Sequence, residues 1–536
     1  MVLIRHWVAF LLVLLLVAGV QATPSKDLGA SDLNADVNVS LSPMVPAGVW
    51  IEDDRPNTLA KEAVAILQAA DQEGLNLKDY DVAELVSQQT ALNEWLGSNS
   101  EQAQAFDAAL TKSTLRYLND LALGRVSAKS VHNHYDRSSG RDFDPVLHLT
   151  KALNASDQDS TFEAVMAQAA PNFPLYPALK SVLAEYRILA SDPAWDEPLA
   201  MPEGKTIEEG DRYVDLNRLQ TRLEQFGDMP EADSAVVYNK QLVQAIKSFQ
   251  TRHGLLVDGV IGPQTLAALN VTPAERVQQI ALSMERLRWT PLQQGDRLIV
   301  VNIPGFMLYA YEVDDQGDLD IQVEMKVVIG RSLNHRTPIF DEDMRFIEFS
   351  PYWNIPISIA RSETIPALER DPEYLTNQGM EFVDRQGNVT RSVTQENLQA
   401  VRQGELRIRQ RPGPRNALGD IKFIFPNNQN IYMHHTPATQ LFSRSRRDFS
   451  HGCIRLEDPV ALAKFVLQNE PQWTETRIRE AMTAGTSRTI KLNKPLPVLI
   501  GYSTVIARDG VVSFYPDIYG HDQSLDQALK KARDLQ

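Results

Sequence analysis

The chain has 536 residues, of which 53 are Lys or Arg and 69 are Asp or Glu, so its formal net charge is −16. This acidic excess argues against a general nucleic-acid binder, which needs a basic surface to displace counterions from phosphate. The single cysteine, Cys453, excludes an intrachain disulfide framework, a CxxC redox motif and a zinc cluster built on cysteines. With 43% hydrophobic residues the chain can bury several cores, and its length predicts three or four domains of about 150 residues each.

Residues 1–22 are typical of a secretory signal peptide. Arg5 and His6 end a short basic segment, and an apolar run of 14 residues follows from Trp7 to Val20. The segment from Val20 to Ala22 has small residues at the two positions that a signal peptidase inspects. The run is shorter than the roughly 20 residues that cross a bilayer, so we expect cleavage after Ala22, with an uncleaved anchor as the alternative. Both alternatives predict an exported protein. If the signal peptide is cleaved, we expect no stable membrane span.

Apolar residues at helical spacing predict a scaffold of amphipathic helices over residues 31–205. One helix face is formed by Leu59, Ala63, Ile66, Leu67 and Ala70. The same spacing recurs in the residues before Gly124 and again in residues 179–189. These residues form no set of a catalytic type, so we interpret the block as structural support.

Residues 212–288 predict a compact unit of about three helices. Leu242, Ala245, Ile246 and Phe249 fall on one helix face, and the turn residues Asp258-Gly259 and Gly262-Pro263 precede another helix. The run AIKSFQTRHGLLVDGVIGPQTLAALN resembles the peptidoglycan-binding module of cell-wall enzymes, a small helical bundle. A helical linker domain that binds no ligand is the alternative.

Residues 296–520 are dominated by β-strand patterns. Alternation at 298–303 and 321–327, and the short runs 346–349 and 421–425, predict strands. A long polar insertion at 358–419 interrupts them, and such a stretch is usually a functional lid or a disordered excursion. We expect residues 521–536 to form a C-terminal tail.

The candidate chemistry gathers around Cys453. Three of the ten histidines, His434, His435 and His451, lie within 19 residues of it. The apolar residues before His434 predict that it ends a strand. Residues 450–452 predict a sharp turn into the cysteine. Asp458-Pro459 then predicts a helix start, so we expect Cys453 on a loop between a strand and a helix.

A cysteine in this setting can serve as a nucleophile. A free thiol with a pKa of about 8.5 is only a few per cent thiolate at neutral pH, so attack needs a nearby base or cation. A histidine supplies this either as a thiolate–imidazolium pair or by taking the proton during attack. The backbone amides of Gly452 and Cys453 are candidates to face a developing oxyanion. The alternative is a packed core thiol beside a structural histidine.

The motif SHGCIR, with an HxT upstream at this spacing, resembles the signature of L,D-transpeptidases, cysteine enzymes with a YkuD-type catalytic fold. The wider match comprises TPIF (337–340), FSPYWNIP (349–356), RPGPRNALGDIKFIFPN (411–427) and DIYGHD (517–522). With its helical front and middle module, nearly the whole mature chain is similar to the large scaffolded transpeptidases of Gram-negative bacteria. The resemblance implies a multidomain α+β protein: a helical scaffold, a small helical peptidoglycan-binding bundle, and a mostly-β YkuD-type domain with a lid insertion.

The resemblance implies roles for individual residues. Cys453 would be the acyl-forming nucleophile and His434 its general base, while His451 and Gly452 would shape the oxyanion loop. The positions that match substrate-binding or loop-ordering residues are Arg455, Tyr432, Trp353 and Ser450.

One position departs from the family pattern. Many large members have Asp after the base histidine, where this chain has His435, so a backbone carbonyl is the preferred third partner of His434. Spacing alone leaves His435 open as the base, although alternation along a strand points the two imidazoles in opposite directions.

The implied reaction is a peptidoglycan cross-link. Cys453 attacks the carbonyl of diaminopimelate in a tetrapeptide stem, D-alanine leaves, and a second diaminopimelate amine resolves the thioester to give a 3→3 link. Attack by water would give carboxypeptidase activity. The resemblance also implies no metal or cofactor, acylation by carbapenems, a lid formed by the insertion, and a periplasmic location.

The partners implied are peptidoglycan stems and glycan, together with penicillin-binding synthases and D,D-carboxypeptidases, and no nucleic acid. Two alternatives stay open: an L,D-transpeptidase that attaches a lipoprotein to peptidoglycan, and a wall-binding protein without catalysis. A papain-like protease is disfavoured, because such enzymes place the cysteine before the histidine, whereas His434 precedes Cys453 here.

Overall fold

The structure is a computed structural model in which the chain divides into two units, Met1–Pro46 and Ala47–Gln536. The described residues are 45–95, 99–132, 135, 142–155, 160–201, 204–230, 236–290, 295–314 and 317–534. The predicted signal peptide lies outside them. Within these ranges, no helix combines the length and apolar character that crossing a membrane requires.

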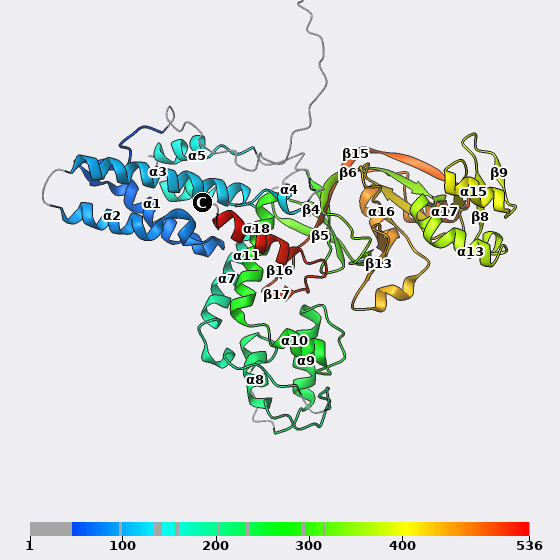
Figure 1. Ribbon diagram of the computed structural model, residues 1–536, viewed down its shortest axis with the longest axis horizontal. Helices are drawn as coiled ribbons and strands as arrows, with labels where there is room; N and C mark the ends of the chain where they lie inside the picture. The colour runs from blue at the N-terminus through cyan, green and yellow to red at the C-terminus, as the bar shows by residue number, and fades with distance from the viewer. Residues whose placement is uncertain are drawn as a thin grey trace, which may run out of the picture. The chain divides into compact units, whose positions relative to one another are not determined.

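The N-terminal part of the second unit is helical, as its apolar spacing predicts. Its helices are α1 (Thr58–Gln68), α2 (Val82–Glu94), α3 (Ser100–Leu123), α4 (Ala128–Val131), α5 (Pro145–Leu153), α6 (Phe162–Ala167) and α7 (Leu175–Leu189), beside a two-residue hairpin of β1 (Ile51–Glu52) and β2 (Arg55–Pro56). Helices α1, α2 and α3 lie side by side (Figure 1). Asn57 caps α1 by accepting the N–H of Ala60, and α3 ends at Gly124. A side chain at Gly124 would clash, since its Cβ would lie 2.5 Å from the Trp289 indole nitrogen.

The middle module is a helical bundle around its own core. It comprises α8 (Leu216–Gln225), α9 (Lys240–Arg252) and α10 (Pro263–Leu269), and the longer α11 (Pro273–Trp289) follows. Gln250 on α9 braces the predicted turn, because its side-chain carbonyl accepts the N–H groups of Asp258 and Gly259 at 3.1 and 2.8 Å. Gly259 has φ +76°, the left-handed region that glycine adopts without strain.

A nine-stranded sheet forms the core of the β-rich part. Its order is β13-β5-β14-β12-β11-β6-β15-β3-β4, and an additional β5–β4 pairing closes it on itself. The strands are β3 (Arg297–Asn302), β4 (Met307–Val313), β5 (Leu319–Gly330), β6 (Phe340–Phe349), β11 (Ile421–Ile424), β12 (Met433–His434), β13 (Asp448–Ser450), β14 (Ile454–Leu456) and β15 (Arg488–Gly501). The long strands β6 and β15 run side by side (Figure 1). The strand patterns predicted from the sequence match β3, β5, β6 and β11, although β3 and β11 each end one residue before the predicted stretch does.

One face of this sheet carries the hydrophobic core. Ile347, Phe423, Met433 and Ile454 are fully buried in one cluster with residues of α16 (Pro459–Leu467) and α17 (Glu475–Thr483). Asp458 caps α16 as predicted, accepting the N–H of Val460 at 3.1 Å. Since side chains alternate along a strand, the neighbours of these core residues face the opposite side of the sheet.

The insertion is a folded subdomain, which we call the cap (residues 351–419). Its elements are β7 (Trp353–Asn354), α12 (Ile357–Ile359), α13 (Ile365–Arg370), α14 (Tyr374–Asn377), β8 (Met380–Val383), β9 (Val389–Thr390), α15 (Gln395–Gln403) and β10 (Arg407–Gln410). The four strands form a sheet of their own, and Leu368, Phe382 and Ile408 are fully buried in a separate core. The sequence of the cap looks solvated because some of its charged residues are buried in ion pairs. Glu381, 2% exposed, pairs with Arg391 and Arg409. Of the two alternatives that the sequence left open, the disordered excursion is therefore wrong.

The C-terminal residues, expected to form a tail, are mostly a helix. Strands β16 (Val505–Arg508) and β17 (Val511–Phe514) form a hairpin, and α18 (His521–Asp534) follows. Asp517 of the DIYGHD motif accepts the N–H groups of His521 and Asp522 at 2.8 and 3.0 Å, which starts the helix. Asp522 in turn forms an ion pair with Arg286 on α11.

Candidate active site

Four polar side chains form a row across adjacent strands. The register pairs Glu348 of β6 with Lys422 of β11, Lys422 with His434 of β12, and His434 with Arg455 of β14. Directly paired residues project from the same face of a sheet. This face lies opposite the apolar core, so the four polar side chains of the row project away from that core.

Cys453 immediately precedes β14 and is two residues before Arg455, so its side chain shares the face of the row. It is half-buried, and its Sγ donates to the carbonyl oxygen of Asn430 at 3.7 Å. Burial raises the pKa of the Cys453 thiol, while hydrogen bonds from Tyr432 and the charges of Lys422 and Arg455 oppose this rise. The thiol is therefore protonated at neutral pH and needs a base at the moment of attack.

His434 has the tautomer and charge of a general base. It is 4% exposed, and its Nδ1 donates to the carbonyl oxygen of His435, which leaves the Nε2 lone pair free of the ring proton. Burial, together with the charges of Arg455 and Lys422, lowers the pKa of His434 to about 3. The predicted backbone-carbonyl partner is confirmed. A neutral imidazole beside a protonated thiol favours proton transfer during attack over a resident thiolate–imidazolium pair.

His435 is engaged elsewhere. Its Nδ1 lies 3.3 Å from Oδ2 of Asp420, and its N–H donates to the carbonyl oxygen of Ile421 at 3.0 Å. The ring also packs so closely on Gly419 that a Cβ there would lie 2.5 Å from Nδ1. Alternation thus places His434, and not His435, on the face of Cys453.

The turn from 450 to 453 is held by its own hydrogen bonds. The Ser450 hydroxyl donates to the Cys453 carbonyl and accepts the N–H of Gly452 at 3.1 Å. Ser450 is only 2% exposed, so the structure gives it a bracing contact where the resemblance implied substrate binding. The Gly452 amide is likewise occupied, which leaves the Cys453 amide as the candidate oxyanion donor. The glycine itself is required by its φ of +114°.

The motifs TPIF and DIYGHD support this turn from behind. The Thr337 hydroxyl donates to the Gly452 carbonyl at 2.7 Å and accepts the N–H of Gly330 at 2.9 Å. Tyr519 donates to the Gly330 carbonyl and accepts the N–H of Thr337 at 3.2 Å. A Cβ on Gly330 would lie 1.9 Å from the His335 carbonyl oxygen, so this close approach also requires glycine.

His451 connects the cysteine turn to the cap. Its Nε2 lies 2.7 Å from Oε1 of Glu363, and its ring centroid is 4.7 Å from that of His335. Glu363 belongs to a π-helical turn, Ala360–Thr364, a geometry that often occurs at functional sites. The His451 imidazole is thus directed at the cap.

Breaking this contact should loosen the cap without disabling the nucleophile. For Glu363→Ala we expect the KM for the substrate to rise by at most about fivefold, with kcat within about twofold, because half-exposed ion pairs contribute about 1 kcal/mol or less. Steady-state kinetics with Glu369→Ala as the matched control tests this, since Glu369 pairs with Arg402 within the cap. A tenfold fall in kcat at unchanged KM would contradict it.

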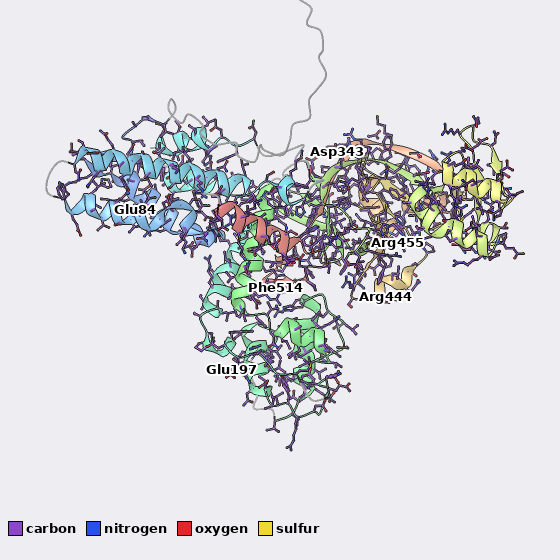
Figure 2. The ribbon with its side chains drawn as sticks, viewed as in Figure 1. Glu84, Glu197, Asp343, Arg444, Arg455 and Phe514 are labelled. Carbon is purple, nitrogen blue, oxygen red and sulfur yellow. The ribbon has the colours of Figure 1, made fainter. Side chains whose placement is uncertain are left out.

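Two residues assigned to substrate binding occupy different settings. Arg455, labelled in Figure 2, belongs to the polar row. Its Nε is buried without a hydrogen-bond partner in the part of the chain that the structure describes. A buried donor without a partner is a candidate to bind a ligand oxygen that enters the site. Trp353 instead pairs with Gln410 in the cap sheet and packs against the cap core, so the structure does not bring it to Cys453.

Sequence reasoning missed three features. It assigned no role to Lys422, whose signal is a lone cation in the apolar strand IKFIF. It could not find Glu363, which lies 88 residues from its partner His451. It also placed Cys453 on a loop shortly before a helix, and it missed the three-residue strand β14 that lies between the loop and the helix. Across the described ranges, no cluster of three or more His, Cys, Asp or Glu side chains is arranged to hold a metal ion.

Comparison with known protein families matches three stretches of the chain. Residues 296–490 match the YkuD family, described as the L,D-transpeptidase catalytic domain. Residues 47–183 match a family described as a scaffold domain, and residues 212–269 match one described as "Putative peptidoglycan binding domain". The polar row and Cys453 all lie within the first stretch.

One curated relative and two solved structures are similar to parts of the chain. A Haemophilus influenzae protein named "Putative L,D-transpeptidase" is 31% identical over 297 residues, which are 55% of this chain and 58% of that protein. The chain thus spans somewhat more than half of that relative's length. A Stackebrandtia nassauensis L,D-transpeptidase structure is 14% identical, covering 56% of this chain and 96% of that one at a TM-score of 0.22. A Clostridium acetobutylicum structure, titled a fused zinc-dependent amidase, peptidase and peptidoglycan-binding protein, is 12% identical, covering 55% and 99% at a TM-score of 0.18.

Proposed function

We propose that the protein forms 3→3 cross-links between peptidoglycan stems through a thioester on Cys453, starting from the match of residues 296–490 to the L,D-transpeptidase catalytic domain. The observation that carries the proposal is that Cys453, with a protonated thiol, and His434, neutral and buried, project from the same face of the sheet where β12 and β14 pair. The adjoining match to a peptidoglycan-binding domain supports the same substrate. Because peptidoglycan lies outside the cytoplasmic membrane, we expect the protein in the periplasm.

In the acylation half, Cys453 Sγ attacks the diaminopimelate carbonyl as His434 Nε2 takes the thiol proton. The tetrahedral oxyanion is stabilised by the Cys453 amide, the donor that the turn leaves for it. The amine of D-alanine then leaves with the proton from His434. A thioester remains on the sulfur, and the imidazole is again neutral.

In the second half, the side-chain amine of another diaminopimelate attacks the thioester carbonyl. His434 accepts the amine proton and returns one to the departing sulfur. The products are a 3→3 amide and the free thiol. When water attacks in place of the amine, the product is a tripeptide.

Arg455 supplies recognition in this scheme. Arg455 follows Cys453 by two residues along the strand, so its side chain, with the unpartnered Nε, projects from the same face. A carboxylate of the donor stem satisfies this group by a charge-assisted hydrogen bond. The cap, joined to the cysteine turn through Glu363 and His451, covers the donor once it is bound.

Mass spectrometry of the products tests the proposal. The full chain is incubated with disaccharide-tetrapeptide, and a preparation alkylated with iodoacetamide is the control, because the chain has one cysteine. We expect a dimer linked between two diaminopimelates together with released D-alanine, and neither from the alkylated protein. Tripeptide without dimer would contradict cross-linking and point to water, or to a protein amine absent from the assay, as the acceptor.

A further inference from the structure

Lys422 is a cation placed within an apolar strand. Its neighbours Ile421 and Phe423 are fully buried in the core of the sheet, while Lys422 projects to the opposite face. Burial lowers the pKa of its ammonium group, because the charged form loses hydration in this position. The mechanism described above gives it no task.

The ammonium group lies against the side chain that contacts the sulfur. Lys422 Nζ is 3.9 Å from the centroid of the Tyr432 ring, a close cation–π contact. Tyr432 lies across from Cys453, because these residues directly precede the paired Met433 and Ile454, and it opposes the rise in the pKa of the thiol. Its carbonyl accepts the N–H of Ile454 at 3.1 Å, which fixes the two strands beside the nucleophile. Burial raises the pKa of Tyr432, so its hydroxyl stays protonated.

No carboxylate neutralises this cation at close range. Glu348 is the paired residue on the far side of Lys422, yet within the described ranges the two form no ion pair within 4.0 Å. The Glu348 carboxylate instead accepts the Ser487 hydroxyl at 3.0 Å. Lys422 therefore lies between Glu348 on one side and Tyr432 and Cys453 on the other, and its charge acts on Glu348 and Cys453 alike.

A bound substrate would cancel the charge of Arg455 but not that of Lys422. The titratable and charged groups that face this region are Tyr432 and His434 on β12, Lys422 on β11, Glu348 on β6, Arg455 on β14, His451 and Arg331 in the adjoining loops, and Glu363 on the cap. Arg455 is offered to a substrate carboxylate, which would cancel its charge. Lys422 lies behind the Tyr432 ring and keeps its charge when substrate binds.

We propose that Lys422 is a positioning residue for the nucleophile: it holds the Tyr432 ring against Cys453, and its charge favours the thiolate that attack requires. The proposal rests on the proposed function only in taking Cys453 as the reacting group. It predicts an effect on the thiol itself, which is measurable without any peptidoglycan substrate.

The test is the pH dependence of alkylation by iodoacetamide, followed by intact mass because the chain has a single cysteine. For Lys422→Met we expect the midpoint to rise by about one pH unit, so alkylation slows about tenfold at any pH below both midpoints. Lys422→Arg restores the charge and should keep the wild-type midpoint. Lys491→Met is the matched control, because Lys491 is an exposed lysine of the same sheet.

A folded Lys422→Met protein with the wild-type midpoint would overturn the proposal, since a purely structural lysine would alter the melting temperature alone. An equal rise in Lys422→Arg would also overturn it. Should Lys422→Met fail to fold, Glu348→Gln gives the opposite sign: removing the opposing negative charge should lower the midpoint, and an unchanged or higher midpoint overturns the proposal. Loss of transpeptidation with these alkylation shifts intact would count against the proposed function and not against Lys422.

Discussion

Replacing Cys453 with alanine should abolish both the dimer and the tripeptide, with turnover reduced at least about 10⁴-fold. The chain offers no second thiol to take over the attack. The fold should survive, because the half-buried sulfur contributes one weak hydrogen bond to Asn430, and the turn is held by Ser450 and Thr337 instead. Product analysis by mass spectrometry and thermal unfolding together measure the two effects.

Cys453→Ser is the matched control for shape. It keeps a hydrogen-bonding group of similar size but replaces a thiol with a hydroxyl that a neutral imidazole activates poorly. We expect it to be as inactive as the alanine variant and to resist acylation by a carbapenem. More than a few per cent of wild-type activity in either variant would show that the thioester scheme is wrong.

Replacing His434 with alanine should lower kcat/KM by about 10²- to 10⁴-fold, the usual contribution of a general base. His435→Ala is the matched variant one residue away, and its loss should stay under about tenfold because that ring contacts Asp420 and Gly419. Steady-state rates of both variants decide between the two histidines. A larger loss for His435→Ala would transfer the role of base to His435.

The pH profile adds a second check on the same residue. Because burial lowers the pKa of His434 to about 3, its imidazole is neutral and keeps the lone pair that a base needs from pH 5 to 8. We therefore expect kcat/KM to show no acid limb due to His434 near pH 6.5. Such a limb, if it persists in a His451→Ala variant, would contradict the buried neutral imidazole.

The elements that the sequence predicts well are those with a strong period. The face formed by Leu242, Ala245, Ile246 and Phe249 lies on α9, and the alternation at 321–327 lies on β5. The internal fold of the cap was not predictable, because its core residues are scattered over strands and helices of four to nine residues. Such elements are too short to establish a period. Ion pairs such as that of Glu381 also make its composition look fully solvated.

The residue types of the site were predictable from the sequence, but the strand register that brings them together was not. Spacing brought His434 near Cys453 along the chain, but only the parallel pairing of β12 with β14 shows that both project from one face. Lys422 comes from β11, and its relation to them depends on the same long-range register. The hydrogen bond that occupies the Gly452 amide depends on the exact rotation of the Ser450 hydroxyl, which no sequence pattern records.

The two ends of the cap meet in the catalytic sheet. Phe349 pairs with Ile421, and the N–H of Ser350 donates to the carbonyl oxygen of Asp420 at 2.8 Å, so the chain leaves and re-enters at neighbouring backbone positions. A tight hairpin between these positions would preserve the register that aligns Lys422 with His434. The cap is thus an insert with a single joint, and replacing it there would leave the strand register around Cys453 unchanged.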